Sequence, residues 1–443
     1  MVSGGIALVM LVVAVVVLIF LTARVKLNAF VALILVAFLY GILTGMPLLD
    51  IIGHIRGGFG GTLGYIGIVI VAGTIMGTIL EKTGAAFSMT NAILRLVGKK
   101  RSPLAMSIAG YVVSIPVFCD SGYVILTPLN KALAKETGKS MAVMSVALAT
   151  GLYATHTMVP PTPGPIAAAG LVGADLGAVI GLGLVVSIPA MIAGYLWATL
   201  FAKRYNIEPQ LAEDYESVKA KYGELPSAFM SFLPLVVPIV LILLKSIAEF
   251  PTQPFGEGGF ATFISFIGDP VTALILGVLL SFLLVKKETL AEATSEWTGE
   301  GIRNAALILA ITGAGGAFGR ILQNSPMVEF IENNLATLPL GILLPFIVSA
   351  AIKSAQGSST VAIITTASIM APLLSGLGLS PALTVISIGA GAMVISHAND
   401  SYFWVVSQFS DMDVKTAYKA YTSSTLVEGV AAFAVVIVLS IFI

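Results

Sequence analysis

Two histidines and two aspartates stand beside apolar runs in this 443-residue chain, where their side chains could bind and release protons. A histidine titrates near neutrality, and a carboxyl group shielded from water can hold a proton. His397 and Asp400 share one polar stretch, and Asp120 and His156 are similar residues earlier in the chain. We predict that these four side chains bind and release a proton while the protein carries out its function. The alternative is that they form polar helix ends hydrogen-bonded to the backbone.

Two further segments combine helix-breaking residues with groups that suit an anion. Residues 159–165 contain four prolines and a glycine, so a helix must end there and a new one begins at 166 or 167. The free N–H groups and positive dipole end of that new helix would face an anion. Residues 356–361 resemble this segment, because three hydroxyls precede a helix expected over 362–370. For 159–165, the alternative is a simple surface loop.

A lysine close to the second segment could add a cation for the same anion. Lys353 lies three residues before Gln356, although its flexible side chain could instead extend towards water at an interface. Hydroxyls, amides and one cation would together hold a carboxylate. The predicted substrate-binding residues are Thr162, Gly164, Lys353, Gly357, Ser358, Ser359, Thr360 and Asn399.

The composition shows which elements must position these residues. Hydrophobic residues make up 57% of the chain and charged residues only 10%, whereas soluble proteins carry about 25% charged residues. At roughly 20 residues for each bilayer-spanning helix, the chain has room for about a dozen spans. Broken backbone at membrane depth is tolerated only where protein or a water-filled cavity surrounds it. We therefore predict an all-α, multi-pass membrane protein of about 12 transmembrane helices whose broken segments mark an interior site.

Several functional classes are excluded by what the sequence lacks. The 23 basic residues are balanced by 23 acidic ones, so nucleic acid is not an expected partner. There is one cysteine, Cys119, and the three histidines form no metal-binding motif, so we predict no metal site, no cofactor and no enzyme activity. No ATPase domain is present either. Transport would have to be driven by an ion gradient or by the gradient of the substrate itself.

Weak internal similarity predicts a duplicated architecture. Residues 71–81 match 311–323 at an offset near 242, Pro128 aligns with Pro372 at 244, and His156 aligns with His397 at 241. Duplicated halves are typical of secondary transporters, with the site where the halves meet; the alternative is chance similarity in an apolar alphabet. We predict two related, inverted halves, 1–202 and 231–443, joined by a polar linker, 203–230. The predicted broken segments lie near 118–129, 158–177, 353–372 and 396–406.

Taken together, these motifs resemble the gluconate permease (GntP) family of secondary transporters. The resemblance rests on Gly60-Gly-Thr-Leu-Gly64, His156 with Pro160-Pro161 and Pro163-Gly-Pro165, Gly315-Gly-Ala-Phe318, Gly357-Ser-x-Thr-Val-Ala362 and Ser396-His-x-Asn-Asp-x-x-Phe-Trp404. It implies uptake of gluconate or a related hydroxy acid with protons across the inner membrane. The implied fold is similar to the ion-transporter superfamily with paired re-entrant hairpins. Some members look like carriers of D-serine, idonate, fructuronate or glycerate.

The chain also departs from the family pattern at the predicted site. Thr162 stands where gluconate-type members usually have histidine, Asp120 where they often have glutamate, and Lys353 and Gln356 in a stretch that is usually more apolar. Glycerate and D-serine are therefore alternative substrates. Sodium is the alternative coupling ion, and a channel or facilitator for organic anions is the alternative class of protein. The sequence is also compatible with a homodimer.

The prediction as a whole is a proton symporter for a small organic acid in the lipid bilayer. Residues 161–165 and 357–360 would form two hairpin tips that hold the anion.

Overall fold

The computed structural model describes residues 2–210, 217, 224–249, 254–334 and 341–443, and every regular element within them is helical. Seven of these helices are long and apolar enough to cross a bilayer. An eighth candidate is the pair α12 (Gly259–Ile267) and α13 (Pro270–Phe282), which is bent by 61°, and six shorter apolar helices accompany them. The predicted all-α membrane architecture is confirmed. The seven long segments are Gly4–Thr22, Leu48–Lys82, Leu176–Arg204, Ala228–Ala248, Lys287–Gln323, Ser359–Leu377 and Val414–Leu439.

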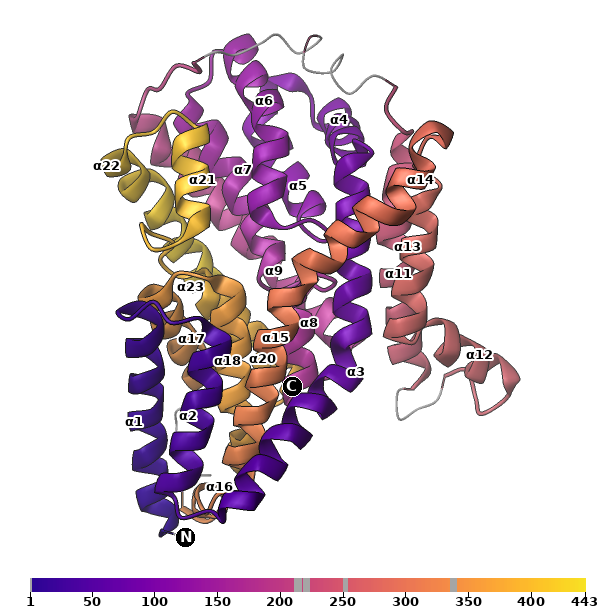
Figure 1. Cartoon of the computed structure of the whole chain (residues 1–443). Coiled ribbons are helices and arrows are strands. Elements are labelled where there is room, and N and C mark those ends of the chain that lie inside the picture. Colours follow the sequence, from indigo (N-terminus) through magenta and orange to yellow (C-terminus); the bar gives the residue numbers. More distant parts are fainter. Residues whose placement is uncertain (1, 211–216, 218–223, 250–253, 335–340) are drawn as a thin grey trace.

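Two long helices cross the centre of the molecule and pack against one another: α3 (Leu48–Lys82) and α15 (Thr298–Gln323) (Figure 1). Their contact is close because glycines lie on both sides. A side chain at Gly58 would collide with the backbone of Gly316 and Ala317. Small residues let membrane helices approach in this way, where van der Waals packing drives helix association.

Two helical hairpins lie in the two halves of the chain. In the first, α5 (Ser102–Val113) is joined to α6 (Cys119–Thr137) by residues 114–118, and in the second, α17 (Leu343–Gln356) is joined to α18 (Ser359–Met370) by residues 357–358. The first tip was expected at 161–165 and lies instead at 114–118. Pro116 has no N–H group to continue the α5 helix, so the chain turns there, and 119–129 continues as helix.

Each half also contains a helix that is interrupted and then restarts. Helix α7 (Met141–His156) is followed by a break at 157–162 and then by α8 (Pro163–Val172). Helix α20 (Pro381–Met393) is followed by a break at 394–400 and then by α21 (Ser401–Phe409). The four prolines of the sequence motif therefore occupy the end of one break and the start of the helix that follows it. The helix therefore ends as expected, but it restarts at Pro163, earlier than the expected 166 or 167, because proline is tolerated in the first turn of a helix.

The helix starts support the predicted duplication. Ser102, Cys119 and Met141 begin α5, α6 and α7, and Leu343, Ser359 and Pro381 begin α17, α18 and α20, at offsets of 241, 240 and 240 residues. These offsets agree with those between the sequence motifs. The two interrupted segments come together because α8 packs against α20. Helix α8 also packs against α18 of the second hairpin, and both of these helices pack against α15.

The remaining helices surround this centre. Helix α23 (Ser423–Leu439) packs against α20 and α9, and α9 also packs against α7. At one side of the molecule, α13 packs against α3 and α11 packs against α13, with α12 at their end (Figure 1). Within the predicted linker, residues 211–216 and 218–223 lie outside the described part of the chain. The other α-helices are α1 (Gly4–Ala23), α2 (Ala29–Leu43), α4 (Ala85–Val97), α9 (Leu176–Leu200), α11 (Ala228–Ala248), α14 (Leu290–Glu292), α16 (Met327–Asn334), α19 (Leu374–Leu377) and α22 (Val414–Ala417).

Candidate functional site

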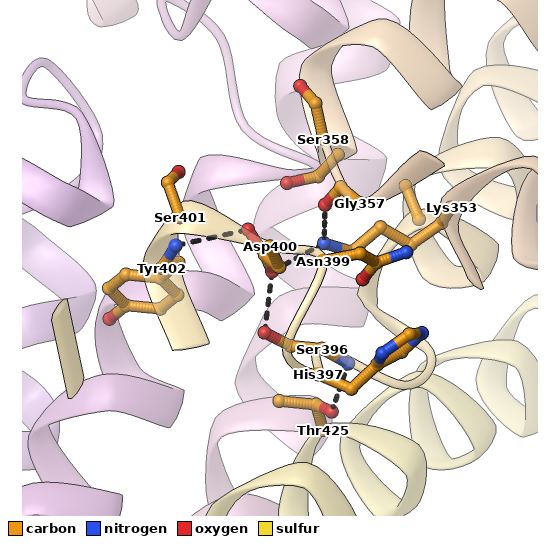
Figure 2. Close-up of polar contacts among 12 residues, drawn as sticks. Lys353, Gly357, Ser358, Ser396, His397, Asn399, Asp400, Ser401, Tyr402 and Thr425 are labelled. Carbon is orange, nitrogen blue, oxygen red and sulfur yellow. Dashed lines mark hydrogen bonds and ion pairs between the residues drawn. The ribbon is translucent and has the colours of Figure 1, made fainter. Parts of the chain in front are cut away.

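A buried ion pair joins the second hairpin to the second break. The Lys353 ammonium lies 2.5 Å from Asp400 Oδ2, and the two side chains are 0% and 5% exposed. Lys353, in the last turn of α17, also donates a hydrogen bond to the carbonyl oxygen of Gly357 (Figure 2). Removing one partner of such a pair leaves an uncompensated buried charge, which typically costs about 3–5 kcal/mol. The pair therefore ties the hairpin tip to residues 394–400.

The Asp400 carboxylate has further donors. Its Oδ2 accepts the Ser396 hydroxyl at 2.5 Å, and its Oδ1 accepts the Tyr402 backbone N–H at 3.1 Å, so Asp400 is the N-cap of α21 (Figure 2). The Tyr421 hydroxyl donates in turn to Ser396 Oγ at 3.2 Å. These donors and the lysine together suit an ionised carboxylate.

The break at 394–400 is held from two sides. On the α23 side, the Ser396 N–H donates to Thr425 Oγ1 at 3.0 Å (Figure 2). On the α17 side, Asn399 Nδ2 donates to the Ser354 carbonyl at 2.9 Å, and His397 Nε2 lies 2.9 Å from the same oxygen. Because a carbonyl oxygen only accepts, His397 carries a proton on Nε2. His397 and Asn399 thus position the break, while Asn399 keeps an exposed surface.

Ser358 and Gln356 organise the second hairpin tip. Ser358 Oγ accepts the Val361 N–H at 3.3 Å and caps α18. The Gln356 side chain donates to the Ser358 carbonyl at 2.5 Å and accepts the Ser358 N–H at 3.2 Å. Ser359 is buried, and Thr360 is partly exposed. The tip therefore presents the N-terminal end of a helix, the feature that the sequence predicted for an anion.

Gly357 is the residue of this tip that no other amino acid can replace without strain. Its φ is +95°, and an added Cβ would collide with the backbone of Asn399. We expect Gly357→Ala to abolish the transport that the sequence predicts and to lower thermal stability, because the tip could not rest on 394–400. Gly138→Ala is the matched control: its φ is +64° with no atom within 4 Å of an added Cβ, so it should cost only about 1–2 kcal/mol and leave transport intact. Equal transport by both variants in proteoliposomes would contradict this prediction.

The first break meets the second hairpin at Gly164. A Cβ at Gly164 would lie 3.1 Å from Ile363 Cδ1 and 3.7 Å from Thr360 Cα, so the start of α8 lies against the start of α18. Thr162 is buried, and its hydroxyl donates to the Val159 carbonyl at 2.7 Å, within its own break. The structure thus brings Gly164 to the tip, and it uses the Thr162 hydroxyl to shape the break.

The other two first-half candidates lie near the ion pair in different ways. Asp120, in the first turn of α6, accepts the Ser401 hydroxyl at 3.2 Å, and this contact links the two halves. His156 is buried at the end of α7, and its Nδ1 has no hydrogen-bond partner among the described residues. It lies one turn after Tyr153, whose ring centroid is 5.9 Å from the Lys353 ammonium, and its own ring is 6.1 Å from that of Phe118. Asp120 remains partly exposed.

Comparison with known proteins identifies the family. The model of the GntP family permease matches residues 6–442. The chain belongs to the GntP permease family. It is therefore a multi-pass permease of the inner membrane, as the sequence predicted.

Relatives of this GntP permease align over nearly its whole length. An uncharacterized permease of Haemophilus influenzae is 39% identical, with 98% of this chain and 92% of the relative covered. A gluconate permease of Pseudomonas aeruginosa is 34% identical, with 96% and 95% covered. The D-serine transporter DsdX of Escherichia coli K12 is 33% identical, with 98% of both chains covered.

Two solved structures share the fold of the GntP permease. Neisseria gonorrhoeae MtrF, described as one of a class of antimetabolite efflux pumps, superposes with a TM-score of 0.67 at 15% identity, covering 94% of this chain and 96% of its own. The Alcanivorax borkumensis YdaH transporter gives a TM-score of 0.66 at 17% identity, covering 93% and 98%. At these identities the likeness concerns the fold alone.

Sequence reasoning missed an aromatic wall beside the ion pair of the permease. The Tyr153 ring centroid lies 5.9 Å from the Lys353 ammonium and 5.4 Å from the ring of Tyr402. Tyr421 continues the wall, with its ring 5.8 Å from that of Tyr402. Rings at this distance contribute to holding an ammonium group. Their only signal in the sequence is a tyrosine in an apolar run, which is equally typical of an ordinary core.

Proposed function

We propose that this GntP permease imports gluconate or a related hydroxy acid together with protons. The gluconate permease of P. aeruginosa, 34% identical over nearly the whole chain, supports the substrate class. The observation that carries the coupling is the buried ion pair of Lys353 and Asp400. Lys353 provides the buried cation that the carboxylate of a substrate would need.

The coupling follows from the charge of this pair. When the substrate carboxylate replaces Asp400 as the partner of Lys353, Asp400 would be left as an unpaired buried anion unless it takes a proton. Proton binding to Asp400 and substrate binding to Lys353 therefore favour one another, which is positive cooperativity with a negative coupling free energy between the two ligands. With gluconate, this exchange keeps the net charge of the site constant.

The surroundings of the pair suit a hydroxylated substrate. Asn399 and Ser401 are exposed next to Asp400, and Thr360 is partly exposed at the start of α18. Their amide and hydroxyl groups can donate to and accept from the hydroxyls of a sugar acid. The start of α18 adds backbone N–H groups, whereas the first turn of α8 offers only that of Gly164, because Pro163 and Pro165 have none. Both helix starts add positive dipole ends.

D-serine is the second candidate substrate, and Asp120 favours it. This partly exposed carboxylate, held by Ser401 at 3.2 Å, would attract an ammonium group that gluconate lacks. The D-serine transporter DsdX of E. coli is 33% identical to this chain. Glycerate, a smaller hydroxy acid, would use Lys353 in the same way as gluconate.

Uptake by the purified protein in proteoliposomes tests the proposal. We expect radiolabelled gluconate to accumulate above its external concentration when an inward proton gradient is imposed, and the accumulation to collapse with a protonophore. A sodium gradient of equal size should have no effect. Accumulation driven only by sodium would overturn proton coupling, and equilibration without accumulation would indicate a facilitator or channel.

Competition in the same assay identifies the substrate. Unlabelled gluconate or idonate should compete best if the sugar-acid assignment holds. If D-serine competes best and Asp120→Asn removes that preference, the second candidate replaces the first.

A further inference from the structure

A second acid lies in the interior of the permease, and the coupling described above does not use it. Glu428 on α23 is 0% exposed, and neither carboxylate oxygen has a hydrogen-bond partner among the described residues. Asp400, by contrast, has a lysine and several donors. An ionised carboxylate buried without partners would cost several kcal/mol, so Glu428 is neutral in this conformation.

Glu428 lies where α23 holds the second break. Thr425, one turn earlier and on the same side of the helix, accepts the Ser396 N–H through its hydroxyl oxygen. A Cβ at Gly429, the next residue, would lie 2.8 Å from the Ala390 carbonyl and 2.6 Å from Val394 Cγ2. The environment of Glu428 therefore depends on how residues 394–400 rest on α23.

Helix α7 packs against α23, and its Tyr153 reaches the hairpin tip. The Tyr153 hydroxyl donates to the Ala392 carbonyl at 3.1 Å and lies 3.5 Å from Ser359 Oγ. The elements packed on α23 include α20, with no titratable residue, and α9, α7 and 418–422, whose titratable residues are Tyr153, His156, Tyr195, Tyr418, Lys419 and Tyr421. Helix α17 also contacts α23, because the Phe346 ring stacks on that of Phe433 at 4.1 Å, and its titratable residue is Lys353. The break at 394–400, with His397 and Asp400, rests on α23 through Thr425.

We propose that Glu428 is a second proton-binding site of the transport cycle, distinct from the Lys353–Asp400 pair. The proposal rests on the proton-coupled import proposed above. When residues 394–400 move away from Thr425, water reaches Glu428 and the carboxyl proton passes to water on the inner side. On return, the empty carrier takes a proton from the outer side before the break closes again.

A second proton site changes the charge that moves with the substrate. One proton on Asp400 balances the gluconate anion, so a further proton on Glu428 makes each import event carry one net positive charge inward. A membrane potential that is negative inside then drives uptake, by roughly 50-fold in accumulation per 100 mV for one charge. Without Glu428, uptake should respond to a pH difference and not to the potential.

The experiment compares the two driving forces in proteoliposomes. The wild type, Glu428→Gln and the matched control Glu296→Gln, which makes the same change at an exposed site, are each given labelled gluconate. One set receives a valinomycin-induced potential of about 100 mV and the other a pH difference of equal size. We expect E428Q to retain exchange of internal for external gluconate and accumulation driven by the pH difference, and to lose accumulation driven by the potential. E296Q should match the wild type.

Each other outcome has a defined meaning. Potential-driven accumulation by E428Q equal to that of the wild type would overturn the role of Glu428. A wild type that accumulates gluconate with a pH difference but does not respond to the potential would also overturn this role. A wild type that responds to neither contradicts the proposed function itself.

If E428Q fails to fold, infrared spectroscopy of the wild type and of Glu428→Asp provides the second measurement. A deuterium-sensitive carbonyl band of a protonated carboxyl group, shifted in E428D, is expected, and the absence of that band from the wild type would overturn the proposal.

Discussion

The Lys353→Met variant is expected to bind gluconate roughly 10- to 100-fold more weakly than the wild type. Lys353 provides the buried cation beside Asp400, and a hydrogen bond to a charged group contributes about 1.5–3 kcal/mol. The variant should also unfold more readily, because removing one partner of a buried pair costs about 3–5 kcal/mol. Uptake kinetics in proteoliposomes and thermal unfolding in detergent measure the two effects.

A double variant separates the stability effect from the binding effect. Lys353→Met combined with Asp400→Asn leaves no buried charge in the pair, so the double variant should recover most of the stability that Lys353→Met loses, while gluconate binding stays weak. Lys82→Met is the control, since Lys82 pairs with Glu300 at 2.9 Å with side chains 38% and 39% exposed, and such pairs contribute about 0–1 kcal/mol. Normal gluconate affinity in Lys353→Met would contradict the role assigned to this lysine.

The breaks in the helices could be predicted from the sequence because local rules determine them. Pro160 and Pro161 lie in the break between α7 and α8, Pro163 and Pro165 begin α8, and Gly357 and Ser358 separate α17 from α18. The same rules misplaced the first hairpin tip. Four prolines give a stronger local signal than Pro116 alone, yet the chain turns back at 114–118 because α5 and α6 pack against one another. Which break forms a hairpin depends on that packing, which no local pattern contains.

The pairing of Lys353 with Asp400 could not be predicted, although both residues were site candidates. They are 47 positions apart and were assigned to different tasks, the lysine to the substrate and the aspartate to the proton. Their contact arises because the tip at Gly357 rests on the backbone of Asn399. The structure places the two residues in one ion pair, and the proposed coupling by exchange of partners follows from this contact.

Glu428 is a residue whose burial could not be predicted from the sequence. From sequence it stands near the start of the last apolar run, where an acid at the membrane interface is ordinary. In the structure, the candidate span begins earlier, at Val414, and Glu428 lies more than three turns inside it. Residues 414–422 hold enough polar residues to read as a loop, so their helical continuation into α23 could not be recognised from periodicity.

The Asp400→Asn variant is expected to bind gluconate without any need for a proton, and to lose proton-driven accumulation completely. Asparagine resembles the protonated aspartate in shape and has no negative charge. Lys353 can therefore bind the substrate carboxylate at every pH. In the wild type, lowering the pH should strengthen gluconate binding, because the proton removes the anion that competes for Lys353. In Asp400→Asn, gluconate affinity measured between about pH 5 and pH 8 should be flat.

Glu428→Gln is the informative comparison for this variant. It leaves the Lys353–Asp400 pair intact, so its gluconate affinity should keep the pH dependence of the wild type, whereas Asp400→Asn should lose it. A pH-dependent affinity that survives in Asp400→Asn would mean that another group takes the proton that competes with the substrate; His156, whose Nδ1 has no hydrogen-bond partner among the described residues, is one candidate. A flat profile in Asp400→Asn alone would assign substrate-linked proton binding to Asp400, since the two variants differ only in which buried acid has been neutralised.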